Sequence, residues 1–276
     1  MRVLIRYLIA IAAIMAFTST ASAQVTVAEW NFNAATSPGN ASTGTGTTSG
    51  AFFPFASSLP LQNGSPNDTN PVIVNGGPNN ASAPRSGPNP GEASGGRQFG
   101  ISTSLAGFGT PTVIWDVLAG YRTSRYYQIT ATTDGVNFNP VPTGTGSSGS
   151  NAFGSFTVSN DGLISIEAVD GLIDTDDGVG YLNDLSYSFP GGSAFDNNPD
   201  FGIRIAAVWE PGGSDFVSSF AGTDATDTVS GYIRDTSLGG NLARYDLVRV
   251  VGTVPEPTSL VLAAFGMMLA GVRRRR

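Results

Sequence analysis

Two neighbouring stretches decide the fold: Tyr181-Leu-Asn-Asp-Leu-Ser-Tyr-Ser-Phe189 and Phe201-Gly-Ile-Arg-Ile-Ala-Ala-Val-Trp209. In the first, one face takes Tyr181, Asn183, Leu185, Tyr187 and Phe189; in the second, one face takes Phe201, Ile203, Ile205, Ala207 and Trp209. Successive side chains of a β-strand point to opposite faces, so this period of two predicts two half-buried strands. The turn residues Gly191-Gly192 between them favour a reversal of the chain.

Six further stretches combine β-branched and aromatic residues with flanking turn signals such as Asp134-Gly135 and Asn160-Asp161-Gly162. These predicted strands are Val25–Phe32, Thr112–Val117, Arg125–Thr132, Gly154–Val158, Leu163–Val169 and Tyr245–Val251. No stretch between the two chain ends carries a helical apolar stripe. The sequence therefore predicts an all-β fold, an antiparallel β-sandwich or jelly roll, with its core in residues 101–253.

Residues 24–100 differ in composition from the predicted sandwich core. After the first predicted strand, the chain is rich in Gly, Pro and Asn, and 10 of the 21 residues from Gly76 to Gly96 are Gly or Pro. Such a composition favours an irregular segment. Phe52, Phe53 and Phe55 interrupt it, so we expect parts of this segment to dock on the sandwich.

The N-terminus has the form of a signal peptide. Arg2 and Arg6 precede an apolar run, Tyr7–Phe17, and Ala21-Ser22-Ala23 fits the pattern of a signal-peptidase site. We expect residues 1–23 to form a signal helix that is removed after Ala23. A signal anchor that is not cut is the alternative.

The last 23 residues have three parts in a fixed order: a turn, Val254-Pro255-Glu256-Pro257; an apolar run, Leu260–Val272; and four arginines, Arg273, Arg274, Arg275 and Arg276. The two prolines prevent a helix from extending backwards. The apolar run has 13 residues, short of the roughly 20 that a spanning helix needs. We expect a short hydrophobic helix that inserts transiently in a membrane, with the arginines on the cytoplasmic side.

This tail, residues 254–276, resembles the PEP-CTERM sorting signal of exported proteins of Gram-negative bacteria. The resemblance implies recognition by an exosortase-type membrane protease and cleavage near Pro255–Pro257. It further implies export through the inner membrane, delivery to the cell envelope or extracellular matrix, and an association with exopolysaccharide. A tail anchor that stays in place is the alternative.

A second resemblance concerns the body of the chain. The segment from Tyr126 to Phe138 has a polar–apolar strand, the turn Asp134-Gly135 and a returning aromatic residue, which is similar to a hairpin of galactose-binding-like (discoidin-type) sandwiches. Phe201–Ile205 and Tyr245–Val251 look like later core strands of that fold. The likeness covers roughly Trp115–Gly252 and departs in the long segment before Ile101.

Composition excludes whole classes of chemistry. The chain has no Cys and no His, and all 14 basic residues are arginine. It therefore lacks a thiol nucleophile, a Ser-His-Asp triad, an ordinary zinc site and a Walker A lysine. Without the two processing segments, 8 arginines and 20 acidic residues leave a net charge of −12. Such a surface disfavours nucleic acid as a partner.

One acidic stretch is a candidate for metal binding. Asp174, Asp176 and Asp177 precede Gly178, and carboxylates at this spacing suit Ca²⁺, which prefers six to eight oxygen ligands. The stretch is not an EF-hand loop, because no glutamate follows at the required position. The alternative interpretation is a solvated acidic loop between two strands, and we expect no other cofactor.

For catalysis, Glu167 and Glu210 lie in predicted strands and are the candidate pair for glycoside hydrolysis. For sugar binding, the candidates are Trp115, Tyr121, Arg122, Arg125, Tyr126 and Trp209; core packing is the competing explanation for the aromatic residues. Arg204, inside an apolar strand, fits a paired interior arginine. The sequence favours a non-enzymatic structural or adhesive protein. A carbohydrate-binding module, perhaps dependent on Ca²⁺, is the alternative, and a glycoside hydrolase is a distant third.

Overall fold

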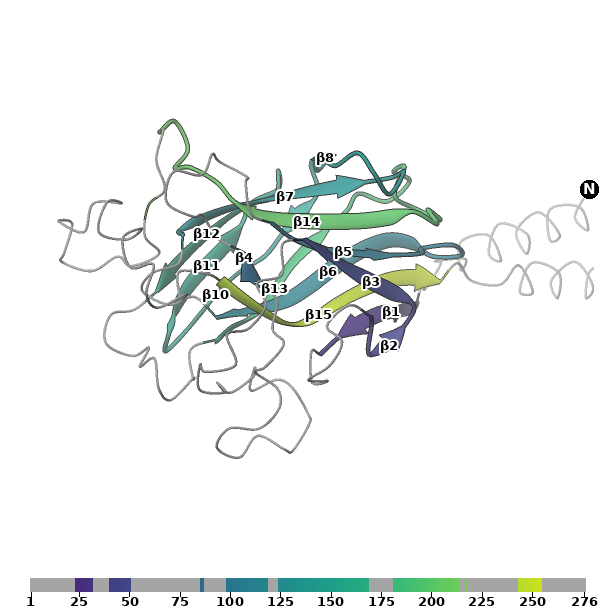
Figure 1. The fold of residues 1–276 in the computed structure, drawn as a ribbon, viewed down its shortest axis with the longest axis horizontal. Helices are drawn as coiled ribbons and strands as arrows, with labels where there is room; N and C mark the ends of the chain where they lie inside the picture. Colours follow the sequence, from purple (N-terminus) through teal and green to yellow (C-terminus); the bar gives the residue numbers. More distant parts are fainter. Residues whose placement is uncertain are drawn as a thin grey trace, which may run out of the picture.

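The computed structural model describes residues 23–31, 40–50, 85–86, 98–118, 124–168, 181–213, 217 and 243–254. These residues form two antiparallel sheets that pack face to face as a β-sandwich (Figure 1). Among the described residues, the structure contains no helix able to cross a bilayer. The two terminal helices expected from the sequence lie outside the described residues.

The seven-stranded sheet has the order β2-β1-β15-β6-β13-β9, and β4 pairs with β15. Its strands are β1 (Ala23–Trp30), β2 (Thr43–Gly44), β4 (Arg85–Ser86), β6 (Gly109–Leu118), β9 (Thr145–Gly146), β13 (Tyr181–Ser188) and β15 (Ala243–Val254). β6 lies between β15 and β13 and is paired along most of its length on both sides.

The eight-stranded sheet has the order β10-β11-β12-β7-β14-β5-β3, and β8 pairs with β7. Its strands are β3 (Gly46–Gly50), β5 (Gln98–Thr103), β7 (Tyr126–Thr132), β8 (Asn139–Pro140), β10 (Ser148–Asn151), β11 (Gly154–Val158), β12 (Leu163–Ala168) and β14 (Phe201–Ala207). β7 and β14 lie at its centre.

Aromatic side chains fill the space between the sheets. Trp115 of β6 is 1% exposed, and Phe99 of β5 stacks on Tyr245 of β15 with 4.7 Å between ring centroids, which joins the two sheets. Phe189 makes an edge-to-face contact with Phe201 at 5.4 Å. Offset and edge-to-face pairs add to the free energy gained by burying the rings.

The sandwich of antiparallel sheets predicted from the sequence is confirmed, and each of the eight predicted strands corresponds to a strand of the structure within a few residues. Two short strands, β2 and β3, lie in the Thr43–Gly50 run, where the sequence predicted a loose segment. β3 pairs with β5 because the neighbouring strand offers a free edge, although its own sequence, GTTSG, has no apolar residue. The sequence placed the start of the sandwich core at residue 101. In the structure, β5 begins at Gln98 and continues past that point to Thr103.

Two details of the predicted faces are corrected. Asn183 does not follow the alternation of Leu185, Tyr187 and Phe189, because a bulge between Leu182 and Leu185 shifts the register of β13 against β6. Trp209 lies beyond the end of β14 and is 37% exposed, so it does not extend the buried face of that strand.

Candidate functional site

The two processing points of the chain lie side by side. In the register of β1 and β15, Ala23 is the partner of Val254, and Gln24 is the partner of Thr253. Ala23 is the residue before the predicted signal-peptidase cut, and Val254 is the first residue of the predicted sorting tail. Both ends of the sandwich domain therefore leave it at one end of the seven-stranded sheet; the rest of the tail, with Pro255, Glu256, Pro257 and the arginines, lies outside the described residues.

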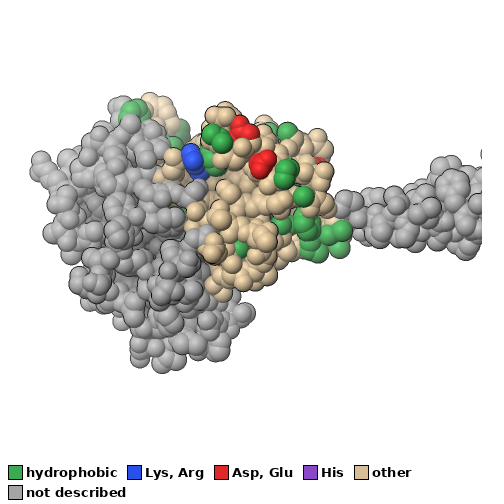
Figure 2. Space-filling model, turned by 45° about the vertical axis from the view of Figure 1, so that its right-hand side comes forward, with side chains coloured by type: hydrophobic (Ala, Val, Ile, Leu, Met, Phe, Trp, Pro, Cys, Tyr) green, Lys and Arg blue, Asp and Glu red, His purple; other side chains and the backbone are tan. Residues whose placement is uncertain are grey.

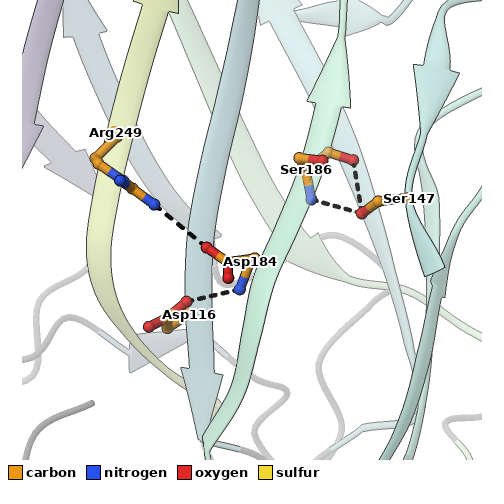
Figure 3. Close-up of polar contacts among 5 residues, drawn as sticks. All are labelled: Asp116, Ser147, Asp184, Ser186 and Arg249. Carbon is orange, nitrogen blue, oxygen red and sulfur yellow. Dashed lines mark hydrogen bonds and ion pairs between the residues drawn. The ribbon is translucent and has the colours of Figure 1, made fainter. Parts of the chain in front are cut away.

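A polar cluster lies on the outer face of the same sheet. Asp116 stands between the core residues Trp115 and Val117 in β6, so its side chain takes the opposite face, yet it is only 2% exposed. Its Oδ1 accepts a hydrogen bond of 2.8 Å from the backbone N–H of Asp184 (Figure 3). Arg249 of β15 pairs with Asp184 Oδ1 at 3.3 Å.

The backbone around Asp116 is irregular on both sides. β13 carries its bulge at Asp184, which has a φ of 58°, and β15 shifts register between Asp246 and Arg249, with Leu247 at a φ of 44°. A bulky residue at positive φ is strained. The bulge of β13 places the backbone N–H of Asp184 against the carboxylate of Asp116 in β6.

Next to this cluster, Ser147 continues the pairing with β13 just beyond the end of β9. Its hydroxyl accepts a hydrogen bond of 2.8 Å from the N–H of Ser186 and donates one of 3.2 Å to the carbonyl of the same residue (Figure 3). The two bonds satisfy backbone groups at an edge of β13. Sequence analysis missed Asp116, Ser147 and Arg249; the single signal was a charged residue, Asp116, within the apolar run of β6.

We expect Asp116→Ala to lower the free energy of unfolding by about 1–3 kcal/mol, because it removes the acceptor of a buried hydrogen bond. Asp116→Asn keeps an oxygen acceptor, so its effect should be smaller. Urea denaturation of the three proteins measures both values. Equal stability of Asp116→Ala and the unmutated chain would show that this bond contributes nothing.

The predicted calcium ligands Asp174, Asp176 and Asp177 lie outside the described residues. Within the described ranges, no group of three or more His, Cys, Asp or Glu side chains could hold a metal ion. The cluster of Asp116 and Asp184 therefore contains too few carboxylates for such a site, and Arg249 already balances Asp184.

The two candidate catalytic glutamates have different settings. Glu167 lies in β12, is 53% exposed and pairs with Arg125 at 3.8 Å between Oε1 and Nη1. Glu210 follows the end of β14 and is exposed, so the prediction that it lies in a strand is wrong. The strand ended early because the chain turns at Pro211-Gly212, where Gly213 N–H bonds to the carbonyl of Glu210.

The candidate sugar-binding residues divide into two groups. Trp115 is buried in the core, so it offers no ring to a ligand. Arg125 and Tyr126 are partly exposed at the start of β7. The N–H of Val208 donates a hydrogen bond to the carbonyl of Tyr126, so Trp209, the next residue after Val208, also lies at this end of β7. Tyr121 and Arg122 lie outside the described residues.

Arg204 is not the paired interior arginine expected from the sequence. It stands on the outer face of the eight-stranded sheet, and its guanidinium carbon lies 3.7 Å from the ring centroid of Phe138. Among the described residues, no carboxylate pairs with it. Such stacking of a guanidinium on an aromatic ring leaves the N–H edges open to an anionic or hydroxyl-bearing ligand.

The turn that carries Phe138 is held by Asp134. This carboxylate accepts hydrogen bonds from the backbone N–H groups of Val136 (2.9 Å) and Asn137 (2.7 Å), from the Asn137 amide (2.7 Å) and from the Thr132 hydroxyl (2.8 Å). These donors favour the ionised form, and the backbone N–H of Asn137 is the largest cause of a pKa well below the ordinary value.

The lowered pKa of Asp134 predicts a defined pH dependence. The carboxylate stabilises the turn fully above the ordinary aspartate pKa, and this contribution is lost as the pH falls through the lower pKa of the folded chain. We expect Asp134 to stay ionised at about pH 3, where a free aspartate is mostly protonated. An NMR titration of the side-chain carboxyl carbon measures it. Asn137→Ala should raise the pKa, and an ordinary pKa in the unmutated chain would contradict the hydrogen bonds described for this turn.

Comparison with known proteins gives one match. Residues 253–276 match the model of the PEP-CTERM protein-sorting motif, which confirms the resemblance seen in the tail. The motif implies export, processing by an exosortase and sorting to the cell surface in Gram-negative bacteria. No curated protein and no solved structure shows a significant match to this chain, and the discoidin-type topology stays a prediction.

Proposed function

We propose that this exported chain, sorted through its PEP-CTERM motif, is a structural or adhesive component of the cell envelope or extracellular matrix, associated with exopolysaccharide and without catalytic activity. The observation that carries the proposal is the pairing of Ala23 with Val254. Because both processing points lie at one end of the seven-stranded sheet, the other end of the sheets points away from the site of processing.

The amino-acid composition of the chain supports a non-catalytic role. Charged residues make up 13% of it, and His, Cys and Lys are absent, so imidazole, thiol and amine groups are not available for acid–base or nucleophilic catalysis. The described surface in Figure 2 is mostly uncharged, with few acidic or basic side chains. Polar uncharged surfaces suit contact with hydrated polymers through many weak hydrogen bonds.

Fractionation of a producing strain and of a deletion strain tests the proposal. We expect the mature protein in the envelope or matrix fraction, and a changed matrix or cell surface when the gene is deleted. Finding the protein free in the medium, together with an unchanged surface in the deletion strain, would overturn it.

A carbohydrate-binding module is the second candidate, and the stack of Arg204 on Phe138 favours it. The guanidinium of Arg204 is held over the Phe138 ring, and the partners of Arg204 in the two neighbouring strands are Gly100 and Thr130. A glycan array with and without Ca²⁺ tests this function. Retention that Arg204→Gln abolishes would support it, and retention on no glycan would exclude it.

A further inference from the structure

Apolar side chains gather around the paired chain ends. The register of β1 and β15 is continuous from Ala23 to Thr26, so Ala23 and Val25 lie on the same face of the sheet as their partners Val254 and Gly252. Gly252 contributes no side chain to this face.

Two further side chains occupy the space that Gly252 leaves. A Cβ atom at position 252 would lie 2.9 Å from Phe108 Cβ and 3.4 Å from Val27 Cγ2. Four residues of the exported chain thus form one surface, the terminal apolar strip: Val25, Val27, Phe108 and Val254. All four are partly exposed. Figure 2 shows hydrophobic side chains gathered at one end of the described surface.

The position of the strip in the chain indicates what covers it. Only the five residues Pro255–Ser259 separate Val254 from the apolar run Leu260–Val272. Fully extended, five residues span at most about 17 Å. When the apolar run lies in a membrane, this short, proline-containing connection keeps the strip at the surface of the bilayer.

The charges at this end agree with an apolar contact. Asp196, near the start of β6, is held by the N–H groups of Thr110 (2.7 Å) and Gly192 (2.6 Å), and the strip itself contains no charged residue. Four apolar side chains bind a bilayer weakly by themselves. A tether this short converts the contact into an intramolecular one, so weak binding suffices to orient the domain.

We propose that the terminal apolar strip rests on the lipid surface while the tail is inserted, and holds the sandwich end-on to the membrane. This inference rests on the proposed function, since it requires the tail to enter a bilayer before it is removed. The tip of the β10–β11 hairpin, where Asn151 bonds to the carbonyl of Tyr181, then lies at the end away from the lipid.

Cysteine labelling tests the orientation. The natural chain has no cysteine, so Ala106→Cys and Ser150→Cys each introduce a single labelling site. Ala106 is exposed in the turn before Phe108, and Ser150 is exposed in β10 at the opposite end. The exported chain with its tail intact is bound to phosphatidylcholine vesicles that carry a nitroxide quencher on the lipid headgroup. We expect strong quenching of a fluorophore at position 106 and none at position 150, with little dependence on salt.

Val25→Asp, added to the Ala106→Cys chain, tests whether the strip contacts the lipid or is only held near it by the tail. It places a charge in the strip and should clearly weaken the quenching at position 106 while the chain still floats with the vesicles. Equal quenching at positions 106 and 150, or quenching unchanged by Val25→Asp, would overturn the orientation and leave the proposed function standing. A chain that does not float with the vesicles would overturn both. If quenching appears only when the sorting protease is added, the strip binds the protease and not the lipid, and the proposal is overturned.

Discussion

Truncation after Pro257 is expected to abolish retention of the protein at the cell surface. The truncation removes the apolar run Leu260–Val272 and the four terminal arginines, which are the membrane-entering and orienting parts of the matched sorting motif. The sandwich should fold unchanged, because β15 ends at Val254. Fractionation of cells and medium measures the distribution, and we expect the truncated protein almost wholly in the soluble fractions.

Replacement of the four terminal arginines by glutamine is the matched variant. It leaves the length and the apolar run intact, so a loss of sorting in this variant reports the arginine cluster alone. Thermal unfolding of both variants shows whether the sandwich has kept its stability. Normal surface retention of the protein truncated after Pro257 would contradict the assigned role of the tail.

Trp115→Ala is expected to lower the free energy of unfolding by about 3–5 kcal/mol, the range for removing a large aromatic ring from a core. Trp115 lies on β6, the strand with long pairings on both sides, and is 1% exposed. Chemical denaturation measures the loss. If the alanine variant does not fold, Trp115→Phe, which removes less volume, should show a smaller loss in the same direction.

Trp209→Ala is the control for that experiment, because this indole is 37% exposed beyond the end of β14. Its loss should change stability much less than the loss of Trp115. The comparison distinguishes core packing from ligand binding, the two roles that the sequence left open for Trp115 and Trp209. A large destabilisation by Trp209→Ala with little effect of Trp115→Ala would contradict the packing described.

The strands were predictable where side chains decide them. β13 and β14 bury alternate aromatic and branched residues, and the period of two is visible without knowledge of their partners. β3 was not predictable in this way, because its five residues are Gly, Thr and Ser and its pairing depends on the free edge of β5. Short polar edge strands are determined by their neighbours more than by their own sequence.

The candidate site was less predictable than the fold. A bulge changes which residues face outward, and neither Asp184 nor Leu247 has a residue type that signals positive φ as glycine does. The contact between Asp116 and Asp184 joins residues 68 positions apart through that irregular backbone. By contrast, the sorting tail acts as a linear signal, so its order of proline, apolar and arginine parts was legible from the sequence alone.

Mass spectrometry of the protein recovered from the cell surface tests the central claim most directly. The mature chain is expected to begin at Gln24, which pairs with Thr253 in β15, and to contain no peptide from Leu260–Arg276. A surface protein that still carries Arg276 would contradict sorting by cleavage of the tail.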